Sequence, residues 1–259
     1  EITVSYLAEE SLLESTASRR AQLEATKHFL CNCGTCQQTV DPVRAFHCLG
    51  CGKGELYLEI LDAGCRPCER GACKLCGFLP TPEQAQDLVA QETRVEEFIQ
   101  EWDRKVGNAG AYLSEDNAKR LEANMAGLFA ERHWLRDRVA RHLVGFYEAM
   151  GAAQEALIFA TRCVSFAAEV YPGFSALHAW SLETQGDLQL RVAGFDVGPD
   201  HVVEPPGDVD LSLCQEVRGV YATASEILEA LFGGDHEFYV AIREKRDVLQ
   251  QLCGGAKKS

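Results

Sequence analysis

Nine of the twelve cysteines lie between residues 31 and 76, and this clustering restricts the fold of the chain more than any other feature. Two cysteines separated by two residues can present their thiolates to one tetrahedral ion from a single turn, whereas disulfide scaffolds belong to secreted chains. The first residues lack the basic-then-apolar pattern of a secretion signal. We therefore expect zinc ligands in an intracellular protein, in the cytoplasm or the nucleus. The clustered cysteines are Cys31, Cys33, Cys36, Cys48, Cys51, Cys65, Cys68, Cys73 and Cys76.

Two of the cysteine pairs have the spacing of a zinc ribbon. Cys48 and Cys51 form the first pair, and Cys73 and Cys76 form the second after an interval of 21 residues. In a ribbon each pair occupies one turn, and the two turns face a single ion. The spacing therefore predicts one complete four-cysteine zinc site.

Three cysteines upstream of the ribbon make an incomplete site. Cys31, Cys33 and Cys36 supply three thiolates, but a closed structural zinc site needs four ligands. Within the chain, only His28 and His47 are nearby substitutes for the fourth ligand.

Cys65 and Cys68 are one pair too many for the ribbon. They could bind a further zinc ion with His47, or replace Cys73 and Cys76 in the ribbon site. They could also share an ion with another chain, which would join two copies of the protein into a homodimer.

Residues 81–259 show the apolar repeat of amphipathic helices. The region opens with Thr81 as N-cap, Pro82 at the first helical position and Glu83 in the first turn. Glycine and proline interrupt the pattern often enough to leave some seven helices, joined mostly by short turns. Such helices stack as antiparallel pairs, the architecture of tetratricopeptide-like arrays, although the consensus of that repeat is absent. The predicted apolar faces are Val95, Phe98, Trp102 and Val106; Leu135, Val139, Leu143, Phe146 and Met150; Ala156, Phe159, Cys163, Phe166 and Val170; and Cys214, Val217, Tyr221, Ala224, Leu228 and Leu231.

The first 80 residues contain shorter elements. We predict a strand at residues 2–6, a helix at residues 12–28 and one hairpin strand at residues 56–60. The fold class is thus mainly α: the end of a β-containing domain at residues 1–30, a cysteine-rich zinc segment at 31–80 and a helical array at 81–259. On the predicted first helix, the inward-facing residues are Leu13, Ala17, Ala21 and Leu23.

The chain is acidic overall, and its charged residues are unevenly distributed along the sequence. The net charge is −14; residues 1–80 hold 8 Lys and Arg against 10 Asp and Glu, and the remainder holds 17 against 29. An acidic surface repels nucleic-acid phosphates, so the sequence argues against a nucleic-acid-binding zinc module. It suits a basic partner such as a lysine-rich segment. No apolar run approaches the roughly 18 residues of a membrane span, and we expect no membrane partner.

Three motifs in fixed order resemble the SET-and-MYND family of protein lysine methyltransferases. Residues 1–7 (EITVSYL) are similar to the last strand of that family's SET domain. Residues 19–23 (RRAQL) are similar to its Arg-Arg-x-Gln-Leu, and residues 29–36 (FLCNCGTC) to its post-SET Phe-x-Cys-x-Cys-x-x-Cys. The stretches 148–177 and 227–236 resemble its C-terminal helical domain.

The resemblance implies roles for individual residues. Tyr6 would orient the substrate lysine amine, since a neutral tyrosine hydroxyl can accept or donate a hydrogen bond. Phe29 would cover the adenine of S-adenosylmethionine, although a plain core phenylalanine leaves the same trace in the sequence. Cys31, Cys33 and Cys36 would bind the post-SET zinc, whose fourth ligand in the family comes from an Asn-His-x-Cys segment.

The chain departs from the family pattern where the methyl donor would bind. The family's Gly-x-Gly and Asn-His-x-Cys segments and its MYND finger do not occur here, and the chain begins without Met, so we expect a fragment. Gly34 also stands where common relatives carry an aromatic residue. Two functions stay open: a lysine methyltransferase acting on a basic protein with zinc and S-adenosylmethionine, or a non-catalytic zinc-ribbon and helical interaction module.

Overall fold

The computed structural model describes residues 6–61, 64–109, 114–171, 173, 175–198, 201–203 and 210–255. Within these ranges the chain is mainly helical, with eight α-helices and a few short antiparallel strands. It divides into two compact units, unit 1 at residues 1–139 and unit 2 at residues 140–259. The mainly α class is thereby confirmed, whereas the tetratricopeptide-like arrangement and the three-part division stay predictions.

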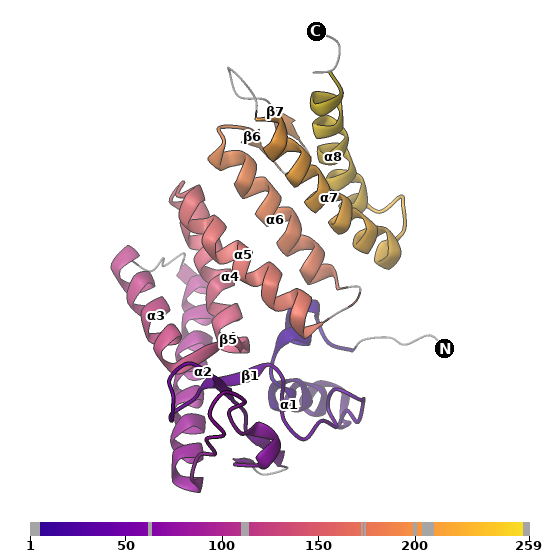
Figure 1. Ribbon diagram of the computed structural model, residues 1–259. Coiled ribbons are helices and arrows are strands. Elements are labelled where there is room, and N and C mark those ends of the chain that lie inside the picture. The colour runs from indigo at the N-terminus through magenta and orange to yellow at the C-terminus, as the bar shows by residue number, and fades with distance from the viewer. Residues whose placement is uncertain are drawn as a thin grey trace. The chain divides into compact units, whose positions relative to one another are not determined.

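Unit 1 combines short strands with two long helices (Figure 1). A three-stranded antiparallel sheet has the order β2-β1-β5, and β3 pairs with β4 in a hairpin. Phe46 of β1 faces Leu56 on one side and Phe129 on the other, and all three side chains are buried. The elements are η1 (Glu9–Leu13), α1 (Thr16–Lys27), β1 (Arg44–His47), β2 (Glu55–Leu56), β3 (Glu59–Leu61), β4 (Gly64–Arg66), η2 (Glu69–Gly71), α2 (Pro82–Ala109), α3 (Glu115–Leu128), β5 (Phe129–His133) and the start of α4 (Trp134–Ala149).

The start of α2 follows the sequence prediction. Thr81 Oγ1 accepts the Gln84 N–H at 3.3 Å, and Gln84 Oε1 accepts the Thr81 N–H at 2.9 Å. This reciprocal capping box satisfies two amides that would otherwise lack a partner at the helix end. The threonine N-cap is therefore confirmed.

The predicted apolar face of α2 is wrong in part. Trp102 is buried, but Val95 is only half-buried and Phe98 is 49% exposed. The helix instead turns Glu92 and Ile99 inward, because Glu92 is held by a buried arginine described below. A charged residue on the inner face changes which side of the helix is buried. A prediction that uses only the spacing of apolar residues does not detect this change.

The first helix also differs from its prediction. Residues 12–28 divide into η1 and α1, and Ser15 caps α1 by accepting the Ser18 N–H at 3.1 Å. Leu23 is buried as expected, but Ala17 and Ala21 are exposed. The inner face is polar: the buried residues of α1 are Thr16, Arg19 and Leu23.

Neither strand predicted in the first 80 residues appears as one continuous strand among the described residues. Most of the strand expected at residues 2–6 lies outside the described residues. The strand expected at 56–60 is interrupted: β2 ends at Leu56, β3 begins at Glu59, and the Tyr57 N–H donates to Gly71 O at 2.8 Å between them. β5 was not predicted, because its five residues lie between two strongly helical stretches.

Unit 2 is a stack of helices in which α5, α6, α7 and α8 each pack on the next in chain order (Figure 1). Glycines end two of them, with φ of +70° at Gly151 and +91° at Gly233, a conformation that glycine adopts at little cost. The predicted faces hold for most residues, but Met150 and Leu231 are exposed. The elements are the rest of α4, α5 (Ala153–Val170), α6 (Ala176–Val192), β6 (Asp196–Val197), β7 (Val202–Val203), α7 (Leu211–Phe232) and α8 (Glu237–Gly255).

Candidate metal centres and the adjoining aromatic pair

The four cysteines of the predicted ribbon converge on one point. The sulfur atoms of Cys48, Cys51, Cys73 and Cys76 all lie within 4.8 Å of one another. The Cys48–Cys76 sulfurs are 3.5 Å apart and the Cys51–Cys73 sulfurs 3.9 Å apart. A tetrahedral zinc with Zn–S bonds of ~2.3 Å has sulfur–sulfur edges of ~3.8 Å. The four thiolates can therefore hold a metal such as zinc with little rearrangement.

Both halves of this ribbon site are built as the same tight turn. The Gly52 N–H donates to Cys48 O and the Gly77 N–H to Cys73 O, each at 2.8 Å. Both glycines have positive φ, +64° and +73°, which residues with a side chain rarely adopt. The glycine after each cysteine pair thus allows the chain to fold back around the metal position.

A further glycine leaves room for the sulfur atoms. A Cβ atom placed on Gly54 would lie 2.4 Å from Cys73 Sγ, which no real side chain tolerates. The Cys48 N–H also donates to Gly54 O at 2.8 Å. Gly54 is therefore required both for the turn and for the approach of the second cysteine pair.

The electrostatics of the ribbon cluster favour a bound cation. Backbone N–H groups of Lys53 and Gly54 lower the pKa of the Cys51 thiol to about 6. The Phe78 N–H acts in the same direction on Cys76, but burial and the neighbouring thiols raise its pKa to about 12. The Cys51 thiol ionises readily but the neighbouring Cys76 thiol does not, because two thiolate charges this close repel each other. A divalent cation removes that conflict, since it binds thiolates.

Cys31, Cys33 and Cys36 form a second cluster, with sulfur atoms also within 4.8 Å of one another. Burial raises the pKa of the Cys36 thiol to about 11. Neither candidate histidine belongs to this group among the described side chains, and His47 Nε2 lies 2.9 Å from Ala126 O. The three thiolates can hold a metal, and the fourth ligand has to come from elsewhere.

Two arginines of α1 hold the loop that carries this second cluster. Arg20 donates to Cys31 O at 3.3 Å and to Cys36 O at 2.8 Å. The buried Arg19 places Nη2 4.0 Å from Cys36 Sγ and donates to Thr16 Oγ1 at 2.9 Å. Such outer contacts orient metal ligands. In the sequence these arginines stood out only as part of a motif, and their contacts with the cysteine loop become visible only in the structure.

Tyr6 and Phe29 lie in edge-to-face contact, with ring centroids 5.7 Å apart and planes at 76°. Tyr6 is 62% exposed and Phe29 39% exposed, and the adjacent Leu30 is exposed as well. The residues to which the sequence analysis assigned the substrate and donor roles are thus neighbours, immediately before the Cys31–Cys36 loop. Phe29 is not a core residue of unit 1.

The remaining cysteines separate into different groups. Cys68 is half-buried and joins neither cluster, and the side chain of Cys65 lies outside the described residues. The alternatives for this pair therefore stay predictions. Cys163 and Cys214 are buried on helices of unit 2, where each occupies an apolar position.

A buried ion network fixes the strand that leads into the ribbon. Arg44 of β1 donates through Nε to Glu92 Oε1 at 2.9 Å, and Trp134 Nε1 donates to the same oxygen at 3.0 Å. His133 Nε2 lies 3.4 Å from it, while His133 Nδ1 accepts the Leu135 N–H. Although burial of Glu92 acts to raise its pKa, these hydrogen bonds hold it at about 2. The ionised carboxylate therefore joins β1, α2 and β5.

Among the described residues, no helix combines the length and apolar composition that a membrane span requires.

No protein-family model matches the chain, and a search of curated proteins gives no match either. A function is therefore proposed from the cysteine clusters and the adjoining pair of Tyr6 and Phe29.

Proposed function

We propose that this chain is part of an S-adenosylmethionine-dependent protein lysine methyltransferase of the SET-and-MYND type. The observation that supports the proposal most is the contact between Tyr6 and Phe29 beside the three-cysteine loop. In the motif resemblance these residues serve the substrate amine and the methyl donor, and a shared site requires them to be close. Their exposure leaves both rings accessible to ligands.

The exposed aromatic pair fits the cofactor in its chemical character. Phe29 offers a ring face on which an adenine could stack, and the cysteine loop that follows it would be fixed by zinc. S-adenosylmethionine would supply a methyl group on a sulfonium centre. Tyr6 would accept an N–H of the neutral lysine amine and so align its lone pair, since alignment is a large part of what such a site contributes.

The test is methyl transfer to lysine-rich protein by the protein that contains this chain, comparing wild type with Tyr6→Phe. The substitution removes the hydroxyl and keeps the ring that contacts Phe29. We expect a loss of rate of about 100-fold or more, which is the size of effect typical of a side chain that acts directly on the reacting group. Thermal unfolding should change little. Unchanged activity would contradict the role of Tyr6.

Donor binding gives a separate measurement. Phe29→Ala should weaken S-adenosylmethionine binding, whereas Leu30→Ala, which truncates the neighbouring exposed apolar residue, should not. Equal affinities in both variants would contradict the adenine-stacking role of Phe29.

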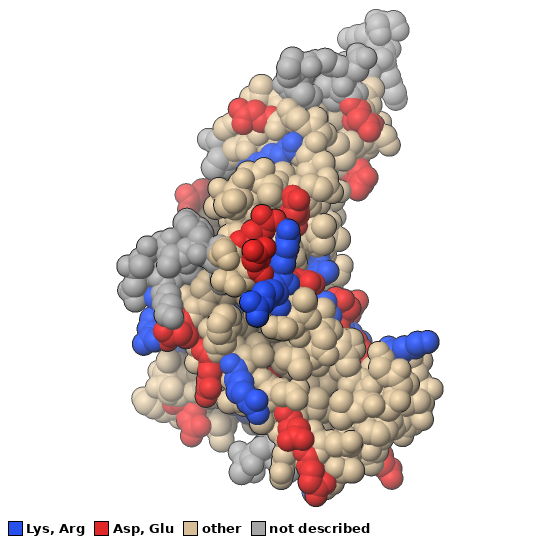
Figure 2. Space-filling model, turned by 90° about the vertical axis from the view of Figure 1, so that its left-hand side faces the viewer, with Lys and Arg blue, Asp and Glu red and all other residues tan. Residues whose placement is uncertain are grey.

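The substrate of this proposed enzyme would be a basic protein. Residues 81–259 carry a net −12, from 17 Lys and Arg against 29 Asp and Glu, and opposite net charge raises encounter rates. Acidic and basic side chains are interspersed on the face drawn in Figure 2. The overall excess of acidic residues would therefore attract the basic substrate. Methylation of a basic protein should slow as the salt concentration rises. Methylation of a neutral peptide with the same lysine should depend less on salt.

A second candidate function is a non-catalytic interaction module. The complete four-cysteine cluster favours it, because such a site stabilises a small recognition fold without help from any other segment. The two proposals differ in one measurement: a module of this kind would bind zinc but no S-adenosylmethionine.

A further inference from the structure

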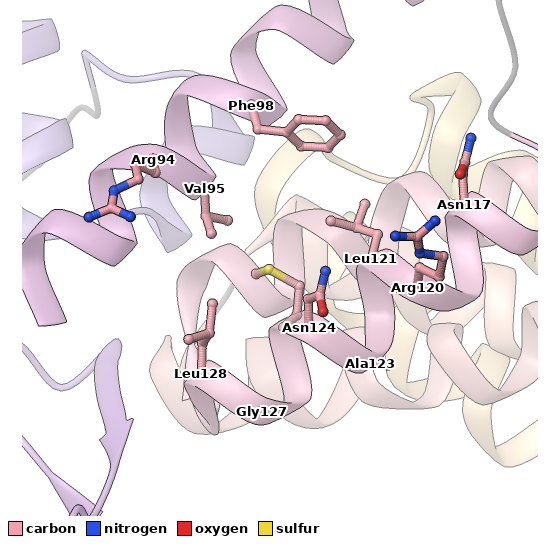
Figure 3. Close-up of a pocket in the computed structure, with 11 residues that line it drawn as sticks. Arg94, Val95, Phe98, Asn117, Arg120, Leu121, Ala123, Asn124, Gly127 and Leu128 are labelled. Atoms are coloured by element: carbon pink, nitrogen blue, oxygen red, sulfur yellow. The ribbon is translucent and has the colours of Figure 1, made fainter.

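Unit 1 contains a groove between α2 and α3 that neither metal cluster uses (Figure 3). Its volume is about 810 Å³, within the range of ~300–1,000 Å³ typical of ligand pockets. Figure 3 shows Val95 and Phe98 on one helix and Leu121 and Leu128 on the other, directed toward the space between the helices. Apolar side chains from both helices thus line the groove.

The apolar lining is only partly covered by the chain itself. Phe98 is 49% exposed, and Val95, Leu121 and Leu128 are half-buried. Met125 forms the floor and is buried. Val95 and Phe98 belong to the face of α2 that the spacing of apolar residues predicted to be buried. This face is therefore open to contact with another molecule.

The charge of the groove is opposite to that of the chain. The polar residues of its lining are two arginines and two asparagines, and no carboxylate lines it among the described residues. Arg94 and Arg120 are both exposed, and neither has an ion-pair partner in the described part of the chain. In a chain of net −14, two unpaired arginines beside one apolar groove form a local exception.

We infer that this groove is a docking site for an acidic amphipathic helix of a partner protein. An amphipathic helix presents apolar residues at i, i+3, i+4 and i+7, and such a stripe is what a groove between two helices accepts. Phe98, Leu121 and Leu128 would contact those residues, while Asp or Glu beside the stripe would pair with Arg94 and Arg120. Neither Tyr6, Phe29 nor any of the cysteines lines the groove, so the inference does not depend on the proposed enzymatic activity.

The charges also explain how such a site would select its partner. The excess of acid on the chain disfavours acidic peptides in general, and only a peptide that reaches both arginines compensates for that repulsion. A basic segment would be attracted to the chain but would meet two like charges at the groove. The groove therefore discriminates between acidic and basic helices through Arg94 and Arg120.

The test uses two fluorescent peptides and the full zinc-loaded chain. Both peptides carry leucine at i, i+3, i+4 and i+7; one has glutamate beside the leucines and the other has lysine. We expect the glutamate peptide to bind by fluorescence anisotropy and the lysine peptide to bind at least about tenfold more weakly. Phe98→Ala should lower the affinity for the glutamate peptide by about tenfold or more, because aromatic side chains buried at such an interface contribute most of the binding energy.

Charge-reversal variants separate the groove from the rest of the surface. Arg94→Glu and Arg120→Glu should each lower affinity by about tenfold. Arg104→Glu makes the same change in net charge on α2, at a residue 68% exposed and outside the groove lining, and should leave affinity unchanged. Thermal unfolding of all four variants should match wild type, because the altered side chains are exposed.

Three outcomes would overturn the inference. The first is failure of the glutamate peptide to bind. The second is binding that Arg104→Glu weakens as much as Arg94→Glu does. The third is binding of a small apolar dye that Phe98→Ala abolishes while neither peptide binds, which would identify a small-molecule pocket instead.

Discussion

The two units of this protein achieve stability by different means. In unit 1, the ribbon rests on strands of two to four residues and on four cysteines whose sulfurs face one point. In unit 2, α6, α7 and α8 enclose a continuous apolar cluster that includes Leu190, Tyr221 and Leu228. Short strands bury little apolar surface, and a metal held by these cysteines would contribute folding free energy that such strands lack. A helical stack supplies it by packing alone.

Each unit nevertheless contains a buried ionic network. In unit 1 the centre is a carboxylate, Glu92, surrounded by donors from three elements. In unit 2 the centre is an amine: Lys245 Nζ of α8 donates to Glu183 at 2.8 Å and to both oxygens of Asp187 on α6. Tyr221 of α7 donates to Asp187 at 2.6 Å. Both networks join elements distant in sequence, and each buried charge requires its partner, because removing one leaves the other uncompensated.

The largest expected difference between the units follows metal removal. Chelation should abolish amide protection around residues 48–76 and leave α5 to α8 protected, because structural zinc contributes about 10–16 kcal/mol to folding in small modules. Hydrogen exchange with mass spectrometry measures this directly. Cys73→Ser should reproduce the effect. Equal loss of protection in both units would show that the metal supports the whole chain.

Breaking the network of unit 2 should have the next largest effect. Lys245→Met leaves the Asp187 and Glu183 carboxylates without their cation, which costs about 3–5 kcal/mol when a buried pair loses one partner. Urea unfolding monitored in unit 2 gives the change. The control is Arg246→Met at the next residue, whose partner Asp247 is exposed, and there we expect a loss below about 1 kcal/mol.

The network of unit 1 should reveal itself in the pH dependence of stability. The pKa of Glu92 is about 2 in the folded protein against an ordinary value of 4.5. The stability it contributes, about 3 kcal/mol, is therefore present above pH 4.5 and is lost as pH falls toward 2. Glu92→Gln should remove that contribution at pH 7 in thermal or urea unfolding.

Glu96, one helical turn later, is a matched control of opposite sign. Burial, with repulsion from Glu92 and Glu14, raises the pKa of Glu96. A raised pKa contributes stability at low pH that is lost as pH rises through the folded value. Glu96→Gln should thus leave stability at pH 7 unchanged or slightly higher, and a loss as large as that of Glu92→Gln would contradict the assignment.

Apart from the control substitutions, the smallest effect is expected from a cysteine that belongs to neither cluster. Cys163 is 3% exposed on α5, so Cys163→Ser should cost about 1–3 kcal/mol by burying a hydroxyl. The zinc content should not change. Zinc loss equal to that of Cys73→Ser would contradict the division of the cysteines into ligands and buried apolar residues.

Local features of the fold could be predicted from the sequence. The spacing of Cys48, Cys51, Cys73 and Cys76 predicted a cluster that the structure forms, because each pair is held by its own turn. The Thr81 cap followed from residue chemistry in the same way, and so did the interruption of the helical pattern by glycines, which the structure shows after α4 and α7. Such features depend on a few neighbouring residues and therefore leave a signal in the sequence.

Contacts between distant residues required the tertiary structure. Arg44 and Glu92 are 48 residues apart, and nothing in their immediate surroundings indicates that they pair in the core. Pairing of β1 with β5 likewise could not be read from residues 129–133, which continue a helical pattern. The inward turn of Glu92 then exposed Phe98 and left the groove between α2 and α3.

The sequence by itself thus determined that four cysteines form a cluster able to hold a metal, and that α2 begins at a threonine cap. The tertiary structure decided which helix faces are buried and which charged residues meet in the core. The physical reason is that caps, turns and cysteine pairs are stabilised by local interactions, whereas burial of a charge is favourable only when a distant partner compensates for its lost hydration.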